Sequence, residues 1–189
     1  MTSKVEIFNK ALYLLGKSRV DSPTEDNENA RVLASIYDSC LDELLVTMPW
    51  NFAVTRQTLT VITGAVNLSP FDYVYQLPQL PYCLRVLSIN NDVQDNYIIE
   101  GRYLYTDELS VNVSYIGRIT DPQQFSPEFV KSLSLLMASE SANALTGSSS
   151  TGENLYGLYQ RHISQAATAN ANEGYLTPNV ESEVINSQI

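Results

Sequence analysis

The spacing of apolar residues predicts helices at both ends of the chain. Near the N-terminus, apolar residues recur every three or four positions between Ser3, which fits a helix cap with Glu6, and Gly16, which fits a helix stop. This first stripe consists of Val5, Phe8, Leu12 and Leu15. The pattern predicts a short amphipathic helix.

A second, longer helix is predicted to begin at Ser22-Pro23-Thr24-Glu25, which has the spacing of a capping box with proline at the first helical position. Pro49 ends it, because proline lacks an amide hydrogen and disfavours a helical conformation at Met48. Its apolar stripe is broad, as in a helical bundle, and consists of Leu33, Ile36, Tyr37, Cys40, Leu41, Leu44, Leu45 and Met48.

The stretch Pro49-Trp50-Asn51-Phe52 marks a change from helical to strand patterning. We interpret Pro49, Trp50 and Phe52 as a junction at which an aromatic pair packs the helical part against a sheet. The alternative is that Trp50 is exposed and docks a partner protein.

Strand patterns fill the region between Phe52 and Arg118. Runs of β-branched and aromatic residues separated by turns predict strands at 58–62, 73–77, 84–89, 97–99, 103–106 and 109–115. Glu100-Gly101-Arg102 fits the turn of a tight hairpin, and Leu109, Val111, Val113 and Tyr115 alternate with polar residues. We expect an antiparallel sheet with one buried face.

Helical patterning returns after Asp121-Pro122. Ser126 and Pro127 predict the start of a third helix, residues 146–152 have the composition of a loop, and a fourth helix is expected from Glu153. Leu155, Tyr159, Ile163 and Ala166 lie on one side of that helix. No period remains after residue 173, but scattered apolar residues make this tail a candidate partner-binding segment: Tyr175, Leu176, Val180, Val184, Ile185 and Ile189.

These elements predict an α+β fold, with an antiparallel bundle of about four helices, an inserted antiparallel β subdomain and an extended C-terminal tail. The bundle comprises residues 1–50 and 119–172, the β subdomain 51–118 and the tail 173–189.

Charge and composition exclude several classes of function. A net charge of −10 argues against a protein that grips a phosphate backbone, because that task needs clustered Lys and Arg. No apolar run is long enough to cross a bilayer, and no secretion signal is evident. Cys40 and Cys83 have no CxxC spacing, so we expect reduced, buried thiols in a protein made in the cytoplasm.

Few residues suggest chemistry. His162 is the only histidine and has no neighbouring ligand or triad partner in its helix, so we expect it at the surface or a boundary. Asp38, Asp42 and Glu43 have a spacing that could pair two carboxylates for acid–base work, although such residues are more typical of a solvated helix face. We therefore expect no enzyme activity, no metal and no cofactor.

Several short motifs occur in an order that resembles the tail tubular protein A family of short-tailed bacteriophages. They are Ala11-Leu12-Tyr13-Leu14-Leu15-Gly16, Glu28-Asn29-Ala30-Arg31, Tyr37-Asp38, Pro49-Trp50-Asn51-Phe52-Ala53, Tyr75-Gln76-Leu77-Pro78, Cys83-Leu84-Arg85-Val86-Leu87, Glu100-Gly101-Arg102, Tyr115-Ile116, Thr120-Asp121-Pro122 and Phe125-Ser126-Pro127-Glu128-Phe129. The chain departs from the family at Gln79-Leu80-Pro81-Tyr82, where a shorter polar turn is usual.

The resemblance implies a head-to-tail adaptor, or gatekeeper, in the neck of a virion. Subunits of this family form a ring, typically of twelve, between the portal protein and the tail nozzle protein, with DNA only as the contents of the channel. We expect a monomer when the protein is free, and no membrane partner. The alternatives are a head-completion connector of a long-tailed phage and, from other classes, a nucleic-acid-binding module or a carboxylate hydrolase.

Overall fold

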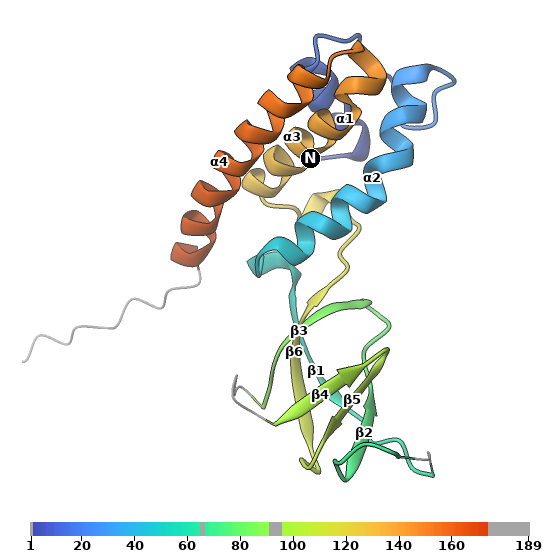
Figure 1. Cartoon of the computed structure of the whole chain (residues 1–189), viewed down its shortest axis with the longest axis vertical. Coiled ribbons are helices and arrows are strands. Elements are labelled where there is room, and N and C mark those ends of the chain that lie inside the picture. Colours follow the sequence, from blue (N-terminus) through green and yellow to red (C-terminus); the bar gives the residue numbers. More distant parts are fainter. Residues whose placement is uncertain (1, 65–66, 91–95, 174–189) are drawn as a thin grey trace, which may run out of the picture.

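The computed structural model describes residues 2–64, 67–90 and 96–173. Helices gather at one end of an elongated molecule and strands at the other (Figure 1). The helices are α1 (Lys4–Leu14), α2 (Glu28–Thr47), α3 (Pro127–Thr146) and α4 (Ser149–Glu173). The strands are β1 (Val54–Leu59), β2 (Tyr73–Gln76), β3 (Cys83–Ile89), β4 (Tyr97–Glu100), β5 (Tyr103–Thr106) and β6 (Val111–Gly117). This arrangement confirms the predicted α+β class with four helices and antiparallel strands.

Local sequence determines both ends of α1. The Ser3 hydroxyl accepts a hydrogen bond from the Glu6 amide at 3.3 Å, which satisfies one of the free donors of the first turn. At the other end, Gly16 has a φ of +65°, and the Lys17 amide donates to the Leu12 carbonyl at 2.9 Å. Glycine fits this left-handed position because it has no Cβ.

The predicted start of the second helix is wrong. Helix α2 begins at Glu28, and its cap is Asn27, whose side chain accepts the Ala30 amide at 2.8 Å. Ser22 instead accepts the amide of Thr24 at 3.2 Å, within a turn. Its hydroxyl therefore stabilises a loop and caps no helix.

Helices α3 and α4 form a close antiparallel pair. Ser126 caps α3 by accepting the Phe129 amide at 3.3 Å, as predicted. The fourth helix begins earlier than predicted, at Ser149, and the Ser148 hydroxyl accepts the Thr151 amide at 3.3 Å. Gly152 therefore lies in the helix, and a Cβ added to it would lie 2.9 Å from the Ser139 carbonyl oxygen. The absence of a side chain is what permits this approach.

The helices share one apolar core, and α3 is its centre. Helix α3 packs against α1, α2 and α4, and it is buried on most sides. The predicted stripe of α2 is buried at Leu33, Tyr37, Cys40, Leu41, Leu44, Leu45 and Met48, while Ile36 is half-buried. On α4, Leu155, Tyr159 and Ala166 are buried and Ile163 is half-buried.

The strands form two three-stranded antiparallel sheets rather than one. The first has the order β1-β6-β3 and the second β2-β5-β4. The tight hairpin at Gly101, with its φ of +59°, is confirmed as the β4–β5 turn. A second apolar cluster lies among the strands, and its fully buried members include Tyr75, Ile89, Leu104 and Tyr115.

Strands β1 and β6 differ most from their predicted boundaries. Strand β1 begins at Val54 and ends at Leu59, because pairing with β6 from Val54↔Ile116 to Leu59↔Val111 defines its length. Beyond it, Val61 makes only an isolated bridge to Tyr75. Leu109 precedes β6, and its side chain is 70% exposed.

Candidate functional site at the junction of helices and sheets

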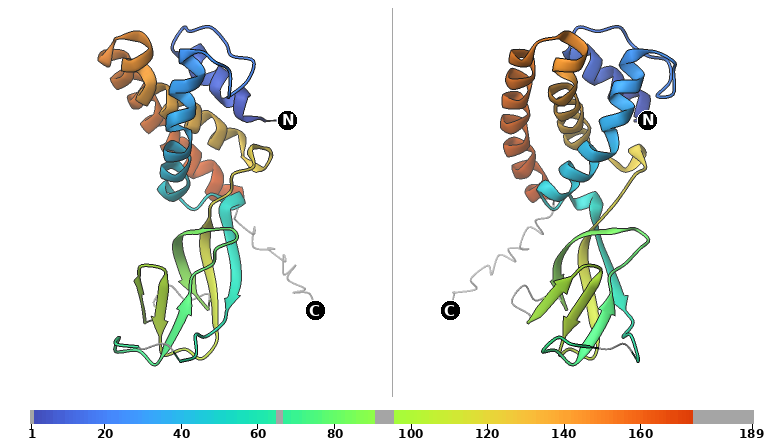
Figure 2. Two further views of the ribbon diagram at one scale, coloured as in Figure 1. Left: turned by 90° about the vertical axis from the view of Figure 1, so that its right-hand side faces the viewer. Right: turned by 45° about the vertical axis from the view of Figure 1, so that its right-hand side comes forward.

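The chain passes twice between the helical end and the β end, and we call residues 48–54 and 117–126 the junction. The first pass leaves α2, makes one 3₁₀ turn at Asn51–Ala53 and enters β1. The second leaves β6 and reaches α3 through another 3₁₀ turn at Pro122–Gln124. Figure 2 shows both passes between the two ends of the molecule. The junction therefore determines how the two ends are held together.

Trp50 lies inside the helical core. Its side chain is 1% exposed, and the indole nitrogen donates a hydrogen bond to the Leu44 carbonyl at 2.9 Å. Leu44 belongs to the last turn of α2, where carbonyls have no amide partner within the helix. Trp50 therefore contributes both apolar packing and a cap for α2, and the alternative of an exposed docking tryptophan is wrong for this conformation.

Four aromatic rings connect the two passes. Phe129 from α3 contacts Trp50 edge-on at a centroid distance of 5.0 Å and Phe52 at 4.9 Å. Phe125, from the second pass, lies 4.8 Å from Phe129 and 5.6 Å from Phe52. The two edge-to-face contacts of Phe129, to Trp50 and Phe52, each add about 0.5–1.5 kcal/mol beyond area burial. The cluster fixes the first pass against the second.

Asn170 ties the far end of α4 to the same place. Its side-chain amide donates to the Pro49 carbonyl at 2.8 Å, and its side-chain oxygen accepts the Asn51 amide at 2.9 Å. The Asn51 side chain in turn donates to the Asn170 carbonyl at 2.9 Å. The apolar pattern does not indicate this role, because Asn170 lies in a polar stretch where the helical period fades.

Arg118 secures the second pass to α2. Its Nε donates to Asp42 at 2.5 Å, and one terminal nitrogen donates to Asp38 at 2.7 Å. The hydrogen bond to Asp38 is the main cause that raises the pKa of Arg118 above its ordinary value. Two of the three carboxylates considered for acid–base work, Asp38 and Asp42, thus both pair with one guanidinium, while the third, Glu43, is exposed.

The remaining candidate groups lie apart. Burial raises the pKa of the Cys40 thiol to about 12 and that of the Cys83 thiol to about 11, and both cysteines are free. His162 is half-buried, 3.4 Å from the Glu128 carbonyl, and burial lowers its pKa. Within the described ranges, no three His, Cys, Asp or Glu residues could hold a metal ion together.

Two further results concern partners. The predicted tail residues Tyr175, Leu176, Val180, Val184, Ile185 and Ile189 lie outside the described residues. Among the helices that are described, none has the length and apolar character needed to cross a membrane.

No protein-family model matches the chain, and no curated protein matches it either.

Proposed function

We propose that this chain is a non-enzymatic head-to-tail adaptor of a bacteriophage neck. In this proposal, copies of the chain form a ring between the portal protein and the tail nozzle protein, around the channel through which DNA leaves. The protein is made in the cytoplasm of the host bacterium and ends in the virion. The order of motifs that resembles the tail tubular protein A family is the sequence support for this proposal.

The structural observation that carries the proposal is the two-ended shape with a fastened junction. Helices occupy one end and strands the other (Figure 1). Trp50 and Asn170 bind the first pass to α2 and α4, and Arg118 binds the second pass to α2. An adaptor has to present two partner surfaces at a fixed separation. A junction held by buried aromatics, amide hydrogen bonds and an ion pair meets that requirement.

The β end offers surfaces for pairing between copies. Each sheet is open, so β1, β3 and β4 are edge strands, and among the described residues no further strand pairs with their outer sides. Strand β2 also lies at an edge, where Val61 bridges Tyr75. Large apolar side chains are also exposed there, including Leu68 at 93%, Leu80 at 91% and Leu109 at 70%. Edge strands and exposed apolar side chains both favour binding to protein.

The charge of the chain suits a conduit for DNA. A net charge of −10 disfavours binding to a phosphate backbone, so DNA would slide past such a ring rather than adhere to it. The proposal therefore assigns protein as the binding partner and DNA as the contents of the channel.

Mixing the purified full-length chain with the portal protein of the same virus tests this proposal. We expect a ring-shaped complex, visible by electron microscopy and as an increase in mass by light scattering. A mixture that contains only free chain and free portal would contradict it. A salt-dependent affinity of the free chain for duplex DNA at moderate salt would instead favour a nucleic-acid-binding module.

A further inference from the structure

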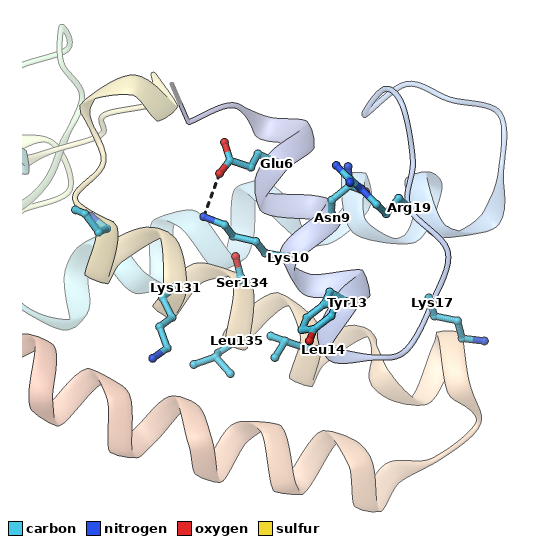
Figure 3. Close-up of a pocket in the computed structure, with 11 residues that line it drawn as sticks. Glu6, Asn9, Lys10, Tyr13, Leu14, Lys17, Arg19, Lys131, Ser134 and Leu135 are labelled. Carbon is cyan, nitrogen blue, oxygen red and sulfur yellow. Dashed lines mark ion pairs between the residues drawn. The ribbon is translucent and has the colours of Figure 1, made fainter.

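A groove with an apolar floor lies between α1 and α3. Its volume is about 610 Å³, and Figure 3 shows Leu14 and Tyr13 from α1 near Leu135 from α3. Tyr13 is 81% exposed and Leu14 is 36% exposed, so the groove presents apolar surface to water. Covering such surface stabilises a complex by about 25 cal/mol for each Å² removed from water.

The rim of this groove is positively charged. Four of the 11 Lys and Arg residues of the chain line it: Lys10, Lys17, Arg19 and Lys131. The carboxylate in the lining is Glu6, and it is already paired with Lys10 at 3.2 Å. Among the described residues, no carboxylate lies within 4.0 Å of the other three cations. The groove therefore suits an occupant that is both acidic and apolar, although the chain as a whole is acidic.

The segment 174–189 of the same chain has that chemistry. It contains Glu181 and Glu183 but neither Lys nor Arg, and its apolar residues are those predicted to bind a partner. Its charge is opposite to that of the groove, and its Leu, Val and Ile side chains match the apolar floor. Opposite charge and apolar complementarity together favour binding.

The last turns of α4, the helix that precedes this segment in the chain, lie beside the start of α3. Ala169 and Asn170 of α4 line a small recess together with Ser126 and Glu128, at the start of α3. Lys131, less than one turn after Glu128, already lines the groove. An extended chain spans about 3.3–3.6 Å per residue, so residues 174–189 reach roughly 50 Å. The groove extends along α3 from Pro127 to Leu135, which is about 12 Å at 1.5 Å per residue.

We propose that residues 174–189 bind in the groove between α1 and α3 of their own chain. Because the segment is covalently joined to α4, its effective concentration at the groove is about millimolar, and weak contacts are enough to keep it bound. Binding within the chain also occupies the apolar residues predicted to bind a partner, so the contact is autoinhibitory and is exchanged for a partner when one is present.

A spin label on the full-length chain tests this contact directly. The substitution Ser187→Cys provides the attachment site, because Cys40 and Cys83 are each only 3% exposed. We expect the label to reduce the amide NMR signals of Tyr13, Lys17 and Lys131, to the same extent at every protein concentration. Unchanged signals in α1 and α3 would overturn the proposal.

Charge reversal identifies the groove as the binding site. Lys17→Glu with Lys131→Glu should abolish the signal loss, whereas the matched pair Arg56→Glu with Arg85→Glu, exposed on β1 and β3, should preserve it. Far-UV circular dichroism verifies that each variant is folded. Signal loss that survives the groove variant would contradict the proposal.

A mixing experiment distinguishes one chain from two. Spin-labelled chain without ¹⁵N is added to unlabelled ¹⁵N chain, and we expect no signal loss. Signal loss in this mixture would show that the groove holds the segment of a second copy, which overturns binding within the chain. Neither experiment contains a portal protein, so failure here leaves the adaptor proposal unaffected.

Discussion

Replacing Trp50 tests how strongly the junction depends on one side chain. Trp50 is 1% exposed, and its indole donates to the Leu44 carbonyl at 2.9 Å. Trp50→Ala removes the whole ring from the core, for which large-to-small substitutions cost about 3–5 kcal/mol of the free energy of unfolding. Trp50→Phe preserves a ring but leaves the buried Leu44 carbonyl without its donor, at a cost of about 1–3 kcal/mol.

Urea unfolding followed by far-UV circular dichroism measures these costs. Leu109→Ala, at a position that is 70% exposed, is the control and should change the free energy of unfolding by less than about 0.5 kcal/mol. Because Trp50 is the only tryptophan, the fluorescence of the unmodified chain should have the blue-shifted emission of a buried indole and should shift to red on unfolding. Emission typical of a solvated indole, or a cost below about 1 kcal/mol for Trp50→Ala, would refute the packing described for the junction.

Four further substitutions have definite expected outcomes. Gly152→Ala should destabilise the chain by about 1–3 kcal/mol, because its Cβ would lie 2.9 Å from a backbone oxygen of α3. Gly157→Ala is the control, because the nearest atom to its added Cβ, in the Arg161 side chain, is 3.9 Å away, and it should stabilise the chain by about 0.5–1 kcal/mol. Equal urea midpoints for the two variants would contradict the close approach of α3 and α4. Arg118→Gln removes two ion pairs worth about 0.2–1 kcal/mol each, and the difference in urea midpoint from the unmodified chain should shrink in 1 M NaCl. Burial lowers the pKa of His162 in the folded chain. As pH drops through about 6.5, the unfolded chain therefore takes up this proton more readily than the folded chain, and the free energy of unfolding decreases. His162→Gln should weaken that fall between pH 7.5 and 5.5, and an unchanged pH profile would argue against its burial.

The two Ser-Pro sequences show when a local pattern is enough to predict the start of a helix. Ser126-Pro127 predicted the start of α3 correctly, because a capping hydroxyl and a fixed proline φ both act within one turn. Ser22-Pro23 has the same pattern but begins no helix. There the backbone is held by a distant residue, since the Asn9 side chain donates to the Val20 carbonyl at 2.9 Å and accepts the Val20 amide at 2.8 Å. A local pattern contains no information on such a contact.

The sheets and the junction show the same limit. Period-2 patterning located most strands, but division into two sheets depends on which strands pair, and β6 pairs with β1 from far along the chain. Trp50 and Phe52 could be singled out because they are large aromatics after a helix-breaking proline. Asn170 and Arg118 could not, because their partners lie 121 and 76 residues away.

The pairing of β1 with β6 determines where the fold can accommodate insertions and deletions. Val54 pairs with Ile116, so the points at which the chain enters and leaves the β end are neighbours, about 4.5–5.5 Å apart. The chain therefore leaves the helical end and returns to it at neighbouring positions, and the β end is a closed excursion of the chain between them. Residues can be added or removed at the remote turns of the β end without altering the path of any helix, so the reach of the molecule can vary while its helical end stays constant.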